Sequence, residues 1–147
     1  MRNLEPSILI RYRSEGSMRV AITRTVALVA LCAAAVGMGS GTAAALDPVV
    51  QLDQGRAGVR LSHSETVAVA SGPAPALITM FVPLTKIGAG LHPETEIYRD
   101  QYGGVYASLR QVIAEPAAHP DGTITLLFNA PGTRGGRVMD VYQHWTN

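Results

Sequence analysis

Residues 123–145 read TITLLFNAPGTRGGRVMDVYQHW. Two runs within them, 123–128 and 137–145, alternate apolar and polar residues, a pattern typical of strands with one buried face. The apolar residues that share a face are Ile124, Leu126 and Phe128 in the first run and Met139, Val141 and Trp145 in the second. A segment rich in glycine and proline joins the runs. We therefore predict an antiparallel C-terminal β-hairpin.

A helix over Pro93–Ala114 is predicted to cover this hairpin. Proline and two glutamates stand in its first turn, where the helix dipole favours negative charge. Its apolar stripe, at alternating spacings of four and three residues, consists of Tyr98, Tyr102, Val105, Leu109 and Val112, widened by Tyr106 and Ile113. We interpret the tyrosines as core residues. Gly103 and Gly104 interrupt the helix at about 1 kcal/mol each relative to alanine, so we expect close packing or a kink there.

Shorter elements are expected upstream of this helix. Ser62 and Glu65 have the spacing of a capping box, in which each side chain bonds the backbone of the other residue. The predicted elements are a short strand over 58–61, a helix over Ser64–Ala70, a buried helix (or a buried strand) over Ala76–Val82 and a loop over 85–91.

These elements predict an α+β fold in a single domain over 58–147. Its small antiparallel sheet consists of the hairpin and possibly the strand at 58–61. The sheet buries its apolar face against the longer helix and the two short ones. Residues 46–57 are expected to be a weakly ordered segment that leads into the domain.

The N-terminal part has the pattern of a secretory leader. Arg19 and Arg24 precede the apolar run 26–38, and small residues ending at Ala43 and Ala45 form a cleavage site. We predict cleavage after Ala45. The apolar run is shorter than the roughly 20 residues that span a bilayer, which favours a cleaved leader. The alternative is an uncleaved leader that tethers the protein to the membrane.

The leader sets the expected limits of the mature chain. We interpret Met18 as the start, residues 1–17 as a non-native extension and residues 18–45 as a signal peptide, because the acidic residues before Met18 do not suit a leader. The mature chain is then 46–147, which is extracytoplasmic, either secreted or in the cell envelope.

Charge and cysteine content narrow the function classes. From residue 46 onward the chain has seven Lys and Arg and nine Asp and Glu, a net charge of −2, against +1 for the whole chain. Without a basic stripe, nucleic acid is excluded as a partner. The chain has a single cysteine, Cys32, inside the leader, which excludes thiol catalysis and disulfides in the mature chain. Its excess of arginine over lysine resembles actinobacterial proteins.

The histidines are the candidates for a metal site. His63, His92 and His119 are each followed two positions later by an acidic residue, and histidine with carboxylate is a zinc ligand set. Their separation along the chain is not that of a ligand pair on one helix, and each has a local role at a cap or turn. We predict no metal or other cofactor.

Two groups of residues are candidates for binding or catalysis. Asp140, Tyr142 and His144 share a strand face and can point into one cleft, although Asp140 and His144 are about 13 Å apart along a strand. The connecting loop 129–136 carries Arg134, with Arg137 at its exit, and guanidinium forks suit carboxylate or phosphate groups. We predict no catalytic residue and take this loop as an interaction surface.

The sequence thus predicts an exported, non-enzymatic binding or interaction protein with a partner in the envelope or medium. The first alternative is a small extracytoplasmic enzyme or metal-binding protein that uses Asp140, His144 and one of the other histidines. The second is an envelope protein held at the membrane by its leader alone.

Overall fold

The computed structural model describes residues 46–146. The expected leader, its cleavage site and the extension over 1–17 lie outside the described residues. Within 46–146, no helix has the length and apolar character needed to cross a membrane. The chain's one cysteine leaves no partner for a disulfide within it.

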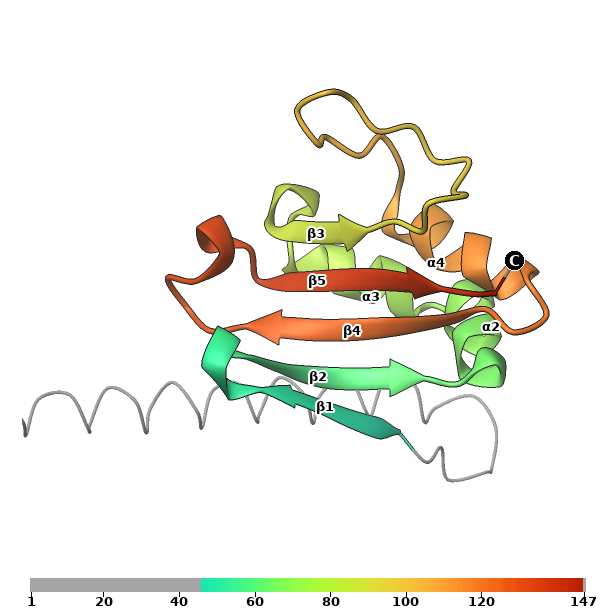
Figure 1. Ribbon diagram of the computed structural model, residues 1–147, viewed down its shortest axis with the longest axis horizontal. Coiled ribbons are helices and arrows are strands. Elements are labelled where there is room, and N and C mark those ends of the chain that lie inside the picture. The colour runs from blue at the N-terminus through green and yellow to red at the C-terminus, as the bar shows by residue number, and fades with distance from the viewer. Residues whose placement is uncertain (1–45, 147) are drawn as a thin grey trace, which may run out of the picture.

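A five-stranded mixed sheet forms one layer of the fold (Figure 1). Its strands are β1 (Asp47–Gln51), β2 (Arg56–Leu61), β3 (Ile87–Gly90), β4 (Thr123–Asn129) and β5 (Met139–His144), in the spatial order β1-β2-β4-β5-β3. Neighbouring strands are antiparallel except β3 and β5, which are parallel. The α+β class is confirmed, and the sheet is mixed and larger than the small antiparallel sheet expected.

The helices of the described residues cover one face of this sheet, and Figure 1 shows them behind it. They are α2 (His63–Ser71), α3 (Ala74–Phe81) and α4 (Leu109–Ala118), with short 3-10 turns η3 (Leu52–Gln54), η4 (Leu84–Lys86) and η5 (Arg134–Gly136). The core between the layers includes Val59 and Leu61 of β2, Ile124, Leu126 and Phe128 of β4, Met139 and Val141 of β5, and Leu109, Val112 and Ile113 of α4. No helix of residues 46–146 lies on the opposite face.

Capping boxes set where two helices begin. The expected box is confirmed at α2, where the Ser62 amide donates to Glu65 Oε2 at 2.7 Å and the Glu65 amide donates to Ser62 Oγ at 3.4 Å. A second box at Ser108 and Gln111 starts α4. Glutamine at the third helical position completes this box, and the sequence interpretation missed it.

The predicted helix over Pro93–Ala114 is wrong in its first two-thirds. Residues 91–108 form a long loop, and the helix extends only over Leu109–Ala118, past Pro116. Gly103 has φ +84°, a left-handed conformation that a right-handed helix excludes. No atom lies within 4 Å of a Cβ built at Gly103, whereas one built at Gly104 would lie 2.7 Å from Asp100 Oδ2. The predicted close packing therefore occurs at Gly104, against a side chain of the same turn, and not at Gly103.

Two segments without a predicted strand join the sheet. β1 occupies the stretch expected to be weakly ordered, and β3 occupies the expected loop over 85–91. Gly88 and Gly90 are needed in β3 because side chains of β5 lie across it: a Cβ on Gly88 would overlap Asp140, and one on Gly90 would overlap the ring of Tyr142. These glycines permit close side-chain approach within a strand.

The second short helix, α3, is only partly buried. Ala74 and Pro75 are buried, and Ile78 and Val82 pack against the core. The outward side of α3 is exposed, so the expectation of a helix buried on nearly all sides is wrong.

Candidate functional site

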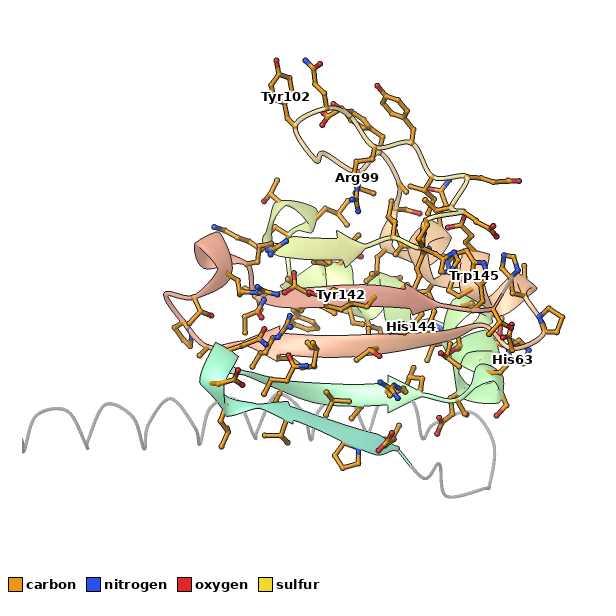
Figure 2. All side chains as sticks on the ribbon, in the orientation of Figure 1. His63, Arg99, Tyr102, Tyr142, His144 and Trp145 are labelled. Carbon is orange, nitrogen blue, oxygen red and sulfur yellow. The ribbon has the colours of Figure 1, made fainter. Side chains whose placement is uncertain are left out.

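Asp140, Tyr142 and His144 alternate along β5 on the sheet face that the described helices leave open. Figure 2 labels Tyr142 and His144 on this strand. The intervening residues point to the helices: Val141 is in the core, and Gln143 Nε2 donates to the backbone oxygen of Val112 in α4 at 2.9 Å. The period-two geometry of a strand therefore separates a structural face from a polar face.

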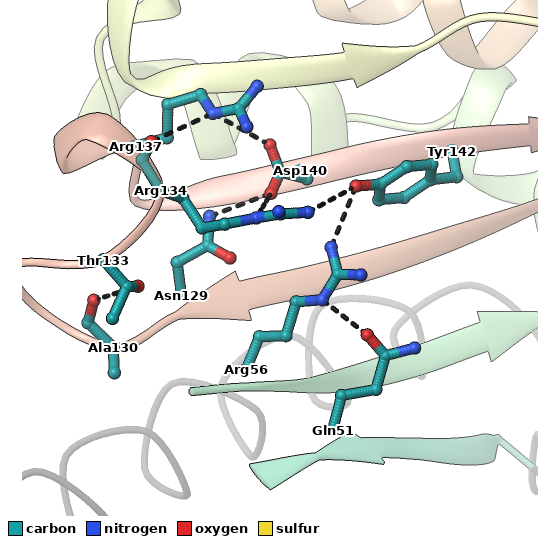
Figure 3. A network of polar contacts seen from close by, with 9 residues as sticks. All are labelled: Gln51, Arg56, Asn129, Ala130, Thr133, Arg134, Arg137, Asp140 and Tyr142. Atoms are coloured by element: carbon teal, nitrogen blue, oxygen red, sulfur yellow. Dashed lines mark hydrogen bonds and ion pairs between the residues drawn. The ribbon is translucent and has the colours of Figure 1, made fainter. Parts of the chain in front are cut away.

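Asp140 is the centre of a polar network at one end of the open face (Figure 3). It is 1% exposed. Asn129 Nδ2 donates to Asp140 Oδ2 at 3.0 Å, Arg137 Nε lies 3.3 Å from Oδ1, and Arg134 Nε lies 3.7 Å from Oδ2. Both arginines of the predicted interaction loop thus fold back onto β5, so the loop is anchored.

Two guanidinium groups converge on the hydroxyl of Tyr142. Arg56 Nη1 donates to this oxygen at 2.9 Å and Arg134 Nη2 donates to it at 3.1 Å. The Arg56 guanidinium carbon also lies 5.6 Å from the centre of the Tyr142 ring, within cation–π range. Tyr142 therefore joins an arginine of β2 to an arginine of the loop before β5.

Arg56 is unusual among these residues because it is buried without an acidic partner in residues 46–146. It is only 9% exposed, and its Nε donates to the neutral amide oxygen of Gln51. Among the described residues, the ion pairs are those of Asp140 with Arg134 and Arg137, so no carboxylate lies within 4.0 Å of Arg56. Buried charges in proteins are normally paired because desolvation of an ion is costly. Arg56 thus holds a positive charge that the described residues do not neutralise.

A shallow depression of about 170 Å³ lies beside this cluster. Its lining residues come from four strands and are Val49, Gln51, Arg56, Arg60, Thr125, Leu127, Tyr142 and His144. Arg60 is exposed, with no ion pair to any described carboxylate. The depression therefore places two cationic side chains, Arg56 and Arg60, in one wall beside the apolar Val49 and Leu127.

His144 lies at the other side of Tyr142 from Asp140. Its Nε2 is 3.1 Å from Thr125 Oγ1. Burial foremost, then the charges of Arg60 and His92, lowers the pKa of His144 below its usual value of 6.5. His144 is therefore neutral at neutral pH.

We expect the lowered pKa of His144 to make the protein less stable in mild acid. The unfolded chain takes up the proton first as the pH falls through the ordinary histidine pKa, so the free energy of unfolding declines below that pH. Replacing His144 with Gln should reduce this decline, measured as the difference between urea unfolding at about pH 7.5 and about pH 5. An equal decline in the wild type and the variant would contradict the assignment.

The structure brings four of the five sequence-predicted site residues together. Arg134, Arg137, Asp140 and Tyr142 form one network, whereas His144 contacts Thr125 and does not meet Asp140. Sequence reasoning missed Arg56, Arg60 and Gln51. The spacing of Arg56 and Arg60 could have identified them, because residues at even spacing in a strand lie on the same face. The strand was expected to begin only at Gly58, so Arg56 was left outside it.

Of the other histidines, His92 and His119 share a neighbour, Trp145, and His63 contacts the turn at Gly122. His63 Nδ1 is 2.9 Å from the backbone oxygen of Gly122, while the rings of His92 and His119 lie 3.9 and 4.4 Å from that of Trp145. In residues 46–146 no three His, Cys, Asp or Glu side chains gather as a metal site would require.

A tyrosine hairpin, residues 98–106, projects beyond the edge strand β3 (Figure 2). Tyr98, Tyr102 and Tyr106 are 67%, 88% and 68% exposed, so their assignment to the core is wrong. Asp100 holds the turn by accepting from the amides of Tyr102 and Gly104 at 2.9 and 2.7 Å. The Gly104 bond foremost, then those of Tyr106 and Tyr102, lowers the pKa of Asp100.

A cleft of about 420 Å³ lies between β3 and this hairpin. The buried side chains of Leu109, Val112 and Val141 line it, together with the partly exposed Arg137. Its volume is within the range of small-molecule sites. Arg137 connects the cleft to the polar network around Asp140.

Comparison of the chain with family models, curated proteins and solved structures found no match. We define the arginine cluster as Arg56, Arg60 and Arg134 around Tyr142, on the open face of the sheet.

Proposed function

We propose that this protein is an exported, non-enzymatic binding protein of the cell envelope or medium, and that its arginine cluster binds an anionic group of the ligand. The leader pattern over 18–45 supports export. The observation that carries the binding proposal is Arg56, a residue that is 9% exposed and whose guanidinium lacks a carboxylate partner among the described residues.

The geometry favours a carboxylate, phosphate or sulfate as the bound group. Arg56 and Arg134 approach one point, the Tyr142 oxygen, from two different elements. Guanidinium groups bind such anions through paired, charge-assisted hydrogen bonds. An anion in the adjoining depression would neutralise Arg56 and meet the exposed Arg60. Acidic polymers of the envelope or medium present such groups in series.

The test uses two probes, inorganic sulfate and poly-glutamate, in titration calorimetry at low ionic strength. Arg60→Gln and Arg134→Gln should each weaken binding about tenfold, because a charge-assisted hydrogen bond contributes roughly 1.5–3 kcal/mol. Arg60 is the more informative position, since its side chain is exposed and the described residues give it no ion pair.

Arg99→Gln is the matched control, because Arg99 is exposed on the tyrosine hairpin, where it donates to the backbone oxygen of Ala89. Its loss should leave the affinity for both probes unchanged. Failure of the wild type to bind either probe, or an equal loss in all three variants, would refute the proposal.

A further inference from the structure

α3 presents an apolar surface to solvent. We define the α3 face as Leu77, Met80, Phe81 and Leu84, which are 45%, 75%, 81% and 53% exposed. The first three stand at helical spacings of three and four residues, so they share one side of α3. Leu84 follows in the adjoining turn η4.

The fold does not account for this exposure. The other side of α3 supplies Ala74, Ile78 and Val82 to the core, which is enough to hold the helix on the domain. A surface helix usually turns polar residues outward, and a helix that is apolar all round is normally covered. Contiguous exposed apolar side chains of this size mark interaction surfaces.

A positively charged side chain lies at each end of the α3 face. Residues 66–91 contain one charged side chain, Lys86, which follows the face. Arg110 lies at the other end of α3, where its guanidinium donates to the backbone oxygens of Ala70 and Gly72. The apolar surface is therefore flanked by a cation at each end, and no acidic residue occurs in this stretch of the chain.

We propose that the α3 face docks on the surface of an anionic lipid bilayer. Its apolar side chains enter the boundary between headgroups and acyl chains, and Lys86 and Arg110 meet the anionic headgroups. Apolar residues with flanking cations are the combination that interfacial helices use.

A second copy of the chain fits this surface less well. Two α3 faces in contact would bring the cations of both copies together, with no acidic residue of 66–91 to pair with them. Docking through α3 also leaves the arginine cluster free, because that cluster lies on the opposite, helix-free face of the sheet. The inference is therefore independent of the proposed anion binding.

The test is co-sedimentation with vesicles of phosphatidylcholine alone or mixed with phosphatidylglycerol. The protein used begins at Leu46, the residue after the expected cleavage site, because the apolar leader would itself bind vesicles. We expect binding to the mixed vesicles that weakens as salt rises. Phe81→Asp should reduce binding at least tenfold, since the variant loses an aromatic side chain that enters the bilayer. Lys86→Gln should reduce it about fivefold.

Leu52→Asp is the matched control. Leu52 is 75% exposed in η3, outside the α3 face, so its replacement should leave vesicle binding unchanged. Three results would overturn the proposal: no binding to mixed vesicles, an equal loss for Leu52→Asp and Phe81→Asp, or equal binding to both vesicle types at all salt concentrations. A concentration-dependent dimer in lipid-free solution that Phe81→Asp abolishes would assign the α3 face to self-association instead.

Discussion

Replacing Gly58 with Ala is expected to destabilise the domain by about 3 kcal/mol or more, at the upper end of what overpacking costs. Gly58 is buried in β2 and pairs with Leu127 of β4. A Cβ at this position would overlap the backbone oxygen of Leu126, and would lie 2.8 Å from the Leu126 carbonyl carbon and 2.9 Å from the Leu127 Cα.

The size of this effect follows from what the added methyl group would meet. A long side chain could rotate away, but the obstacle at Gly58 is the backbone of β4. That strand is fixed on both sides, by β2 and by β5, in the middle of the sheet. Relief of the overlap therefore requires strand separation and the loss of ladder hydrogen bonds.

Urea unfolding of Gly58→Ala checks the prediction, with Gly132→Ala as the control. Gly132 also has no side chain, but its φ is +82° and no atom lies within 4 Å of a built Cβ. Its replacement adds only backbone strain of about 1–2 kcal/mol. A Gly58→Ala protein as stable as the control variant would show that β4 can move aside.

Local patterns in the sequence were enough to predict the α+β class and the residue at which α2 begins. The alternation over 123–128 lies within β4, whose residues Ile124, Leu126 and Phe128 are core residues. The Ser62–Glu65 box formed as predicted. Each of these features depends on residues close together in the chain, which is why spacing alone could identify it.

The failure at Pro93–Ala114 shows the limit of spacing as a criterion. Tyr98, Tyr102 and Val105 fit a helical stripe, but Asp100 bonds the amides of a turn, and Gly103 adopts a left-handed conformation there. Aspartate and glycine favour turns for these reasons. The real helix begins only where Ser108 caps it.

The strand order explains why the arginine cluster was only half predicted. The residue types of Arg134 and Tyr142 suggested a polar site, but Arg56 reaches Tyr142 across β4, which lies between β2 and β5. β3 was missed for a related reason. Its glycines resemble a loop in sequence, and their purpose depends on side chains of β5 that are more than 50 positions away.

Asp140→Ala is expected to lower the free energy of unfolding by about 2–3 kcal/mol. Breaking a fully buried ion pair typically costs roughly 3–5 kcal/mol. We expect less here because the side chains of Arg134 and Arg137 are 32% and 41% exposed, so water compensates part of their lost partner. Asn129 Nδ2 also loses its acceptor, in a residue whose Oδ1 is already buried without a partner.

The same substitution should release the loop before β5. Arg134 has φ +52° and is the one residue other than glycine with a positive φ in the described part of the chain. This conformation costs roughly 1–2 kcal/mol, and the contacts of its side chain with Asp140 and Tyr142 offset that cost. Amide hydrogen exchange at residues 131–137 should therefore accelerate in Asp140→Ala beyond the change at the core of β4.

Asp140→Asn, which keeps an oxygen acceptor but no charge, should show an intermediate loss of stability. Unchanged exchange in the loop would mean that its backbone bonds, such as the Gly136 amide to the Thr133 oxygen at 2.9 Å, hold it without the carboxylate.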